Sequence, residues 1–220
     1  MEWHSDNDLF ALLKRELFTA VVGDILDKMG LRHQFLPPNI QPLRLDMIVA
    51  GRAFPVIAGD VYGDSKKPFG LMLEALDDLK PNEVYVTTGA RRASALWGEL
   101  MSTRALKLGA VGAVCDGYTR DTNGVLKLDY PTFCWGRYAQ DSSVRMGVQD
   151  FRCRIEIGEV GIRPGDIVYG DIDGVLVVPK EAEVECITKA LEKARGEKLV
   201  KKAIEQGMSA VEAFRKYGIM

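Results

Sequence analysis

Two short segments of this sequence carry side chains suited to binding an acidic ligand. Trp97-Gly98-Glu99-Leu100 forms one, and the segment from Asp116 to Arg120-Asp121 forms the other. An arginine offers a planar fork that holds a carboxylate through two hydrogen bonds. Asp121 and Glu99 offer hard oxygen ligands for a divalent cation that keeps several of its waters. Together these groups suit a 2-oxo acid bound to Mg²⁺.

A helix that begins at the first segment would add backbone donors. An uninterrupted helix over residues 95–108 would contain Gly98, which costs about 1 kcal/mol relative to alanine. A helix that starts near Glu99 avoids this cost and leaves the N–H groups of Glu99, Leu100 and Met101 unpaired. Such groups bind carboxylates and phosphates, and Gly98 would let the ligand come close.

The lengths of the intervening elements predict that the two segments meet. A helix from Glu99 to Leu108 spans about 15 Å, and a buried strand over residues 111–115 returns about 17 Å. The loop over residues 116–121 should therefore emerge beside Gly98, at the carboxyl end of a strand, where open α/β sheets bind ligands. The alternative is that Arg120 and Asp121 form an ordinary ion pair in a surface loop.

The apolar periodicity predicts an α/β chain with helices at both ends. A β-α-β unit is expected over residues 83–115, preceded by a strand (47–57) and a helix (69–79), and the helix over residues 95–108 ends at Gly109. The second half is rich in glycine turns, which favours short mixed or antiparallel strands at 132–135, 151–157, 167–169 and 175–178. Helices are predicted over residues 1–30, 181–206 and 209–217. We expect one domain over 1–220, with N-terminal helices (1–30), an α/β core (31–179) and C-terminal helices (180–220).

Composition excludes several classes of function. The chain has 29 Lys+Arg and 31 Asp+Glu, a net charge of −2, which gives no electrostatic basis for nucleic-acid binding. It contains no signal sequence and no apolar run long enough for a membrane, so a cytoplasmic protein is expected. The two histidines, His4 and His33, leave little for a histidine metal site or a Ser-His-Asp triad. The four cysteines (Cys115, Cys134, Cys153 and Cys186) form no CxxC pair and are predicted to be free thiols.

Three further groups are weaker candidates. Arg91-Arg92 could hold the distal carboxylate of a dicarboxylic substrate, although a solvated pair is favoured. Asp171 and Asp173 suggest a calcium loop, but a turn between strands is favoured because no closing glutamate follows. His33 could reach the site of a neighbouring subunit, although a surface position is favoured.

The first two segments taken together resemble the signature of the RraA-like family. The similarity extends to most of the chain, namely TAVVGDILDKMG (19–30), GAVGAVCDGYTRD (109–121), GIRPGDIVYGDIDGVLVVP (161–179) and the tail at 209–219. It implies a compact swivelling β/β/α-type domain. The family includes metal-dependent aldolases that cleave 4-hydroxy-4-methyl-2-oxoglutarate or 4-carboxy-4-hydroxy-2-oxoadipate to pyruvate and often decarboxylate oxaloacetate. It also includes non-catalytic proteins that inhibit a ribonuclease by protein contact, which is the alternative function. Members assemble as trimers or hexamers, so the resemblance implies a homo-oligomer.

The resemblance also implies roles for individual residues. Asp121 matches the ligand of Mg²⁺ or Mn²⁺, Arg120 matches the arginine that holds the pyruvyl group and stabilises the enolate, and Gly98 to Met101 match the loop that binds the substrate carboxylate. Glu99 stands where characterised aldolases carry an aspartate that orients a water for proton transfer. Gly124 stands where they carry another carboxylate. These two departures leave both substrate and activity open.

Overall fold

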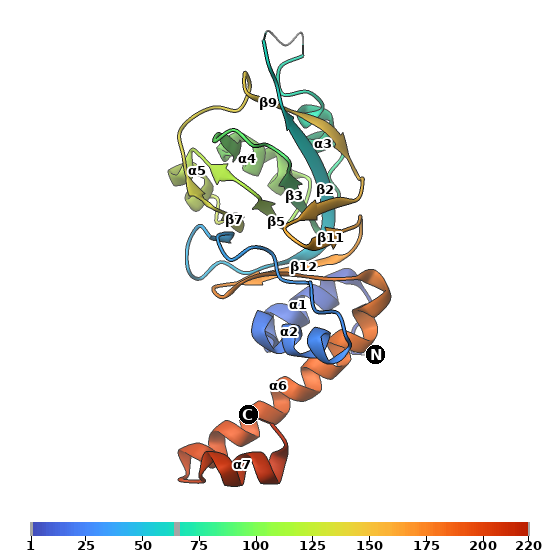
Figure 1. Cartoon of the computed structure of the whole chain (residues 1–220), viewed down its shortest axis with the longest axis vertical. Coiled ribbons are helices and arrows are strands. Elements are labelled where there is room, and N and C mark those ends of the chain that lie inside the picture. Colours follow the sequence, from blue (N-terminus) through green and yellow to red (C-terminus); the bar gives the residue numbers. More distant parts are fainter. Residues whose placement is uncertain (1, 64–66, 220) are drawn as a thin grey trace.

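The computed structural model describes residues 2–63 and 67–219, and its centre is a mixed eight-stranded sheet (Figure 1). Four parallel strands form the middle of this sheet: β2 (Val49–Asp60), β3 (Glu83–Thr88), β5 (Gly112–Cys115) and β7 (Thr132–Cys134). Strands buried on both faces read as continuous apolar runs, and every residue of β3 and β5 is buried.

Antiparallel strands complete the sheet. β1 (Gln41–Pro42) pairs with β7 at one edge, and β12 (Ile167–Asp171) pairs with both β2 and β13 (Gly174–Val178) at the other. β9 (Met146–Phe151) pairs with the far end of β2. A separate hairpin joins β10 (Ile155–Ile157) to β11 (Val160–Ile162).

A second, smaller sheet lies beyond the carboxyl ends of the parallel strands. It consists of β4 (Ala95–Trp97), β6 (Tyr118–Thr119) and β8 (Gly136–Arg137), all parallel. Each of its strands follows one strand of the main sheet in the chain: β4 follows β3, β6 follows β5 and β8 follows β7. The loops that leave the main sheet are therefore held in fixed register, which makes this end of the molecule a rigid place for a site.

Helices form two layers with separate hydrophobic cores. The main core lies between the sheet and the helices α3 (Met72–Asp77), α4 (Glu99–Lys107) and α5 (Thr122–Lys127). The second core lies where α1 (Asp6–Glu16), α2 (Thr19–Lys28) and α6 (Glu183–Glu205) pack against β12 and β13. A short 3₁₀ helix, η1 (Lys180–Ala182), leads into α6.

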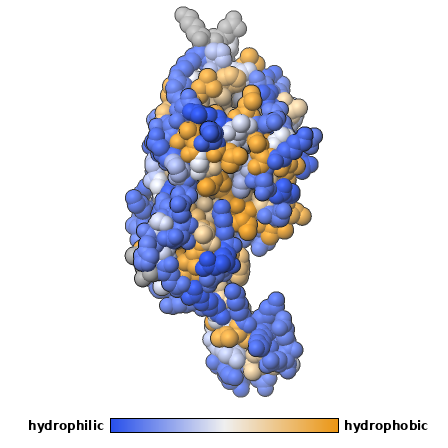
Figure 2. Space-filling model, turned by 180° about the vertical axis from the view of Figure 1, so that it is seen from behind, coloured by the Kyte–Doolittle hydropathy of each residue, from blue (hydrophilic) through white to orange (hydrophobic). Residues whose placement is uncertain are grey.

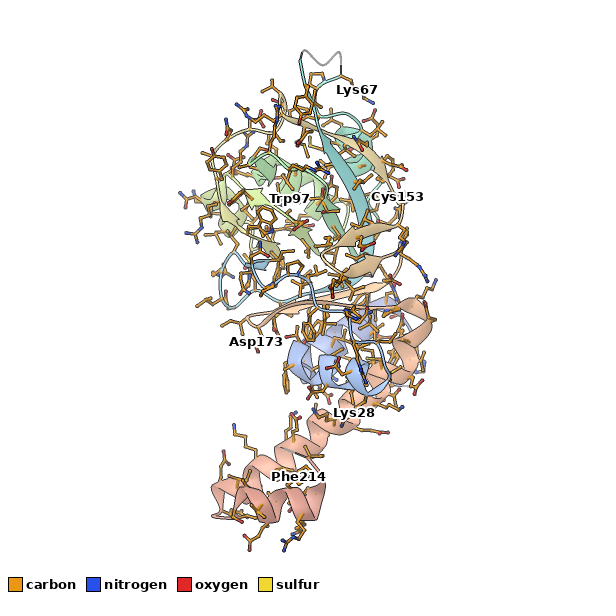
Figure 3. The ribbon with its side chains drawn as sticks, viewed as in Figure 1. Lys28, Lys67, Trp97, Cys153, Asp173 and Phe214 are labelled. Atoms are coloured by element: carbon orange, nitrogen blue, oxygen red, sulfur yellow. The ribbon has the colours of Figure 1, made fainter. Side chains whose placement is uncertain are left out.

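The C-terminal helices project from the body. α6 runs away from the sheet and turns back into α7 (Ala210–Tyr217), so that Phe214 lies far from Trp97 in the middle of the body (Figures 1 and 3). Seen from behind, apolar side chains gather over the body, whereas the projecting helices are mostly hydrophilic (Figure 2). Within residues 2–63 and 67–219, no helix combines the length and apolar character needed to cross a bilayer.

The predicted mixed α/β fold is confirmed, with local differences. The uninterrupted helix over residues 95–108 is wrong, because residues 95–97 pair with β6 and α4 begins at Glu99. The continuous strand over 151–157 is also wrong, because Arg152 adopts the left-handed conformation (φ 54°) and separates β9 from β10. The helix predicted over 69–79 is shorter and begins at Met72. All four cysteines are free thiols, as predicted.

Candidate active site

The start of α4 is fixed by buried side chains. Gly98 is the N-cap residue in extended conformation, and no side chain caps the helix. The buried Trp97 donates from Nε1 to the Ser102 hydroxyl (2.7 Å), which in turn donates to the Gly98 carbonyl (2.9 Å). These bonds order the helix start while leaving its first N–H groups without a side-chain partner, as the sequence predicted for Glu99, Leu100 and Met101.

The loop after β5 lies directly against this helix start. The Arg120 backbone N–H donates to the Trp97 carbonyl (3.0 Å), and the Thr119 hydroxyl donates to the same oxygen (3.1 Å). Thr119 also pairs with Trp97 in the small sheet. The predicted meeting of the two segments is therefore present in the fold.

A cavity of about 240 Å³ opens at this junction. Its polar lining comes from Gly98, Arg120, Asp121, Asp141 and Ser142. Six apolar lining residues come from α3, α4 and the turn before α3, and we call them the apolar wall: Phe69, Met72, Leu73, Leu76, Leu100 and Met101. The cavity is the size of a small metabolite and combines these polar and apolar groups.

Arg120 lies between two carboxylates at the polar end. Its Nη1 is 3.3 Å from Asp141 Oδ1, and its Nε is 3.7 Å from Asp121 Oδ2. The Ser143 hydroxyl donates to Asp141 Oδ2 (2.6 Å). Partial burial raises the pKa of Asp141, but the hydrogen bond from Ser143 and the positive charge of Arg120 outweigh it and hold this pKa below its ordinary value. Asp141 is therefore an ionised partner that orients the guanidinium.

Sequence reasoning missed Asp141 and Ser142. Asp141 enters the site because it forms an isolated bridge with Ala95, the first residue of β4. The sequence offers a weak signal, an Asp-Ser-Ser run typical of a turn, but nothing that indicates which element the turn contacts.

The Asp121 side chain accepts no hydrogen bond within the described chain, and its ion-pair contact is the 3.7 Å approach of Arg120 Nε. The residue is left-handed (φ 53°), a conformation that costs free energy in residues other than glycine and that recurs at functional sites. It stands at the N-cap of α5, yet its side chain makes no cap bond. A Cβ at Gly98 would lie 2.8 Å from Asp121 Oδ2. A side chain at 98 would therefore displace the Asp121 carboxylate, which comes close to the start of α4.

The donor set fits a hard divalent cation. Asp121 offers a carboxylate that lines the cavity and is half exposed. Nowhere in the described chain do three His, Cys, Asp or Glu side chains converge as a metal cage. Mg²⁺ suits such a place because it binds through one or two carboxylates and keeps several waters, whereas a structural zinc site needs four protein ligands.

Glu99 is the first residue of α4, and its predicted catalytic role stays a prediction. It does not belong to the described residues that line the cavity. A Cβ built on Gly124 would lie 2.1 Å from Glu99 Cδ and Oε2, so the Glu99 carboxylate covers the start of α5.

The weaker candidates lie outside the cavity. Arg92 stacks on Tyr62 (4.2 Å to the ring centre), and the Arg91 and Arg92 backbone N–H groups donate to Asp60. His33 is exposed and pairs with Glu159 (2.8 Å), a surface position as favoured.

The segment that contains Asp171 and Asp173 (GDIDG, residues 170–174) forms the turn between β12 and β13. This is the alternative that the sequence favoured over a calcium loop. Asp171 accepts hydrogen bonds from the Thr19 backbone N–H and hydroxyl (2.7 Å each) and from the Asp173 N–H (3.0 Å). It therefore ties the hairpin to the start of α2.

Comparison with known proteins gives a family match over most of the chain. Residues 19–177 match the family model described as RraA-like, Aldolase/RraA. A putative 4-hydroxy-4-methyl-2-oxoglutarate aldolase from Halalkalibacterium halodurans is 32% identical over 91% of this chain and 90% of its own length. Protein DlpA from Legionella pneumophila is 28% identical over 90% of this chain, which spans only about a third (32%) of that protein.

Solved structures share the fold. A structure titled as novel cellulases from microbes associated with the gut ecosystem superposes with a TM-score of 0.83 at 34% identity, covering 89% of this chain and 87% of the other. RraAS2 of Streptomyces coelicolor, titled an unusual member of the RNase ES inhibitor RraA family, superposes with a TM-score of 0.80 at 24% identity, covering 91% and 100%. At this identity the second likeness shows the fold alone.

Proposed function

The chain belongs to the RraA-like family, and on that basis we propose that it is a divalent-metal-dependent carbon–carbon lyase that releases pyruvate from a 2-oxo acid. The observation that carries the proposal is the cavity in which Arg120, the half-exposed Asp121 carboxylate and the uncapped start of α4 converge. The name of the Halalkalibacterium relative supports the same class of reaction. Decarboxylation of oxaloacetate is a further reaction of the same type, since it also leaves a pyruvate enolate.

Different groups of the cavity would bind different parts of the substrate. The N–H groups of Glu99, Leu100 and Met101 stand at the positive end of the α4 dipole and would hold the substrate carboxylate. Arg120 would donate to the 2-oxo oxygen, where negative charge develops as the enolate forms. Donors placed in advance around such an oxygen stabilise the transition state most effectively.

Asp141 and Asp121 play separate supporting parts. Asp141 accepts a hydrogen bond from Ser143 and pairs with Arg120, and so holds the Arg120 guanidinium in place. The guanidinium therefore needs to move little when negative charge develops on the 2-oxo oxygen. Asp121 would hold Mg²⁺ or Mn²⁺. Lewis-acid polarisation of the 2-oxo group is the chemistry that such a cation supplies when bound.

Pyruvate release tests the proposal. The purified chain with Mg²⁺ is supplied with oxaloacetate and with 4-hydroxy-2-oxo acids that do or do not carry a second carboxylate, and pyruvate is followed with lactate dehydrogenase. We expect Arg120→Ala and Asp121→Ala each to lower kcat/KM by about 10²- to 10³-fold. Arg154→Ala removes an exposed arginine of the β10 region and serves as the matched control.

A negative result has a defined meaning. If no substrate yields pyruvate, and oxalate fails to raise the melting temperature in the presence of Mg²⁺, the lyase proposal is wrong. A protein that binds a partner without catalysis, as in the ribonuclease-inhibitor branch, would then be favoured.

A further inference from the structure

Two buried hydroxyl groups hold the backbone on either side of Gly98. The Ser102 hydroxyl donates to the Gly98 carbonyl (2.9 Å), which also accepts from the Ser102 backbone N–H (3.0 Å). The Thr119 hydroxyl donates to the Trp97 carbonyl (3.1 Å), which also accepts from the Arg120 backbone N–H (3.0 Å). The peptide carbonyls before and after Gly98 therefore each accept two hydrogen bonds.

These bonds fix the direction of the first N–H group of α4. Glycine restrains its own backbone least of all residues, so at Gly98 the neighbouring peptide planes must be held from outside. In a planar trans peptide the N–H points opposite to the carbonyl. With the Gly98 carbonyl bound to Ser102, the Glu99 N–H therefore points toward the open end of α4. Gly98, Leu100 and Met101 line the cavity, so this open end belongs to it.

The Trp97 indole gives the chain of hydrogen bonds a single direction. An indole N–H is a donor only, so the Ser102 hydroxyl accepts from Trp97 Nε1 (2.7 Å) and passes its own proton to the Gly98 carbonyl. Hydrogen bonds that run in one direction polarise one another. The chain ends on the peptide that carries the Glu99 N–H, which makes this group a stronger donor to an anion.

All of these groups lie in the interior of one chain. Trp97 is 1% exposed, and Ser102 and Thr119 are both 0% exposed. Water therefore supplies no substitute partner when one of the hydroxyls is removed. The bonds join α4 to the loop that carries Arg120 within the same chain, so they do not depend on what covers the cavity.

We propose that Ser102 and Thr119 are positioning residues of the candidate active site. They hold the first N–H groups of α4 at a fixed place beside Arg120, so that these donors bind the carboxylate and Arg120 binds the 2-oxo oxygen of one ligand. Neither side chain lines the cavity, and each acts through a backbone carbonyl. This inference rests on the proposed function, because the ligand it concerns is the 2-oxo acid of that proposal.

Thr119→Val tests the inference, because valine has the shape of threonine and lacks its hydroxyl. The Trp97 carbonyl keeps its hydrogen bond from Arg120, so the fold should be retained. The dissociation constant of oxalate is measured by calorimetry with Mg²⁺ present. We expect oxalate to bind about three- to tenfold more weakly, an effect the size of one hydrogen bond. Thr119→Ser keeps the hydroxyl and should restore the affinity.

Thr132→Val is the matched control. Thr132 is also 0% exposed in a strand of parallel neighbours, and its hydroxyl also donates to a backbone carbonyl, that of Tyr130 (3.1 Å). It does not line the cavity. The same substitution there removes an equally buried hydroxyl and should leave the affinity for oxalate unchanged.

A merely structural effect would change other quantities. Loss of folded protein lowers the number of oxalate sites per chain and kcat, whereas a misplaced carboxylate donor raises the dissociation constant and KM. Ser102→Ala should raise both of these as well, and it should also lower stability because the buried Trp97 N–H loses its acceptor. The affinity for Mn²⁺, measured by electron paramagnetic resonance, should stay unchanged in Thr119→Val because Asp121 is untouched.

Unchanged oxalate affinity in Thr119→Val or Ser102→Ala, an equal loss in Thr132→Val, weaker Mn²⁺ binding in Thr119→Val, or no oxalate binding by the wild type overturns the inference. If the wild type releases pyruvate and the variants keep its KM and oxalate affinity, the inference fails while the lyase function stands. If Thr119→Val and Ser102→Ala selectively weaken oxalate binding and no substrate yields pyruvate, the lyase function fails while the positioning role stands.

Discussion

The Glu99 carboxylate occupies the space that a side chain at Gly124 would need. A Cβ at Gly124 would lie 2.1 Å from Glu99 Oε2 and 2.6 Å from Glu99 Cγ. The two positions at which this chain departs from the resemblance to the aldolases therefore contact each other. Glu99 is longer than the aspartate that the resemblance implies at this position. Its carboxylate lies beside Gly124, the position at which the resemblance implies a carboxylate and this chain has none.

Gly124→Ala tests how firmly this contact is held. Glu99 is exposed and its carboxylate is the far end of a flexible side chain, so it can turn outward. Alanine inside α5 is favoured over glycine by up to about 1 kcal/mol. We therefore expect the free energy of unfolding, measured with urea, to stay level or rise. A fall of more than about 1 kcal/mol would mean that Glu99 cannot move and that α5 is distorted instead.

Gly98→Ala should weaken metal binding while the fold is retained. The φ of −170° at Gly98 suits alanine, so the fold should be retained. The new Cβ would lie 2.8 Å from Asp121 Oδ2 and push that carboxylate out of place. We expect Mn²⁺ binding, followed by electron paramagnetic resonance, to weaken at least tenfold. Gly124→Ala is the matched glycine control, and equal Mn²⁺ affinity in both variants would show that Asp121 is not the ligand.

The Arg152–Asp78 ion pair predicts how stability depends on pH. Arg152 donates from Nε to Asp78, and this hydrogen bond lowers the pKa of the Asp78 carboxyl group. Because the folded pKa lies below the unfolded one, the stabilisation is complete above about pH 4 and is lost as the pH falls through the folded pKa. The difference in unfolding free energy between the wild type and Asp78→Asn should therefore be constant near neutrality and shrink in acid. A difference that grew as the pH fell would contradict this sign.

We predict that replacing Asp171 lowers the stability of the fold and leaves the activity unchanged. It is 7% exposed and accepts three hydrogen bonds, two of them from Thr19. Asp171→Ala leaves these donors unpaired, and we expect a loss of about 1–3 kcal/mol in unfolding free energy. Pyruvate release at a temperature where the variant is folded should match the wild type. A melting temperature that responds to Ca²⁺ in the wild type but not in Asp171→Ala would instead indicate a calcium site.

The sequence by itself determined the local elements and one long-range relationship. The apolar runs of β3 and β5 and the lengths of α4 and β5 were enough to place Arg120 beside Gly98, because a helix and the strand that follows it have fixed rises per residue. The cost of glycine within a helix also pointed to the true start of α4, although continuous periodicity favoured a longer helix over residues 95–108.

Only the tertiary structure decided which other groups surround Arg120. Asp141 reaches the site through a bridge to Ala95. Half of the apolar wall, namely Met72, Leu73 and Leu76, comes from α3, which lies before β3 in the chain. Glu99 turns toward Gly124, and Arg152 leaves the extended conformation to bind Asp78 and Glu83. These relationships depend on strand register and side-chain rotamers, which are set by packing between segments far apart in the sequence and leave no periodic pattern in it.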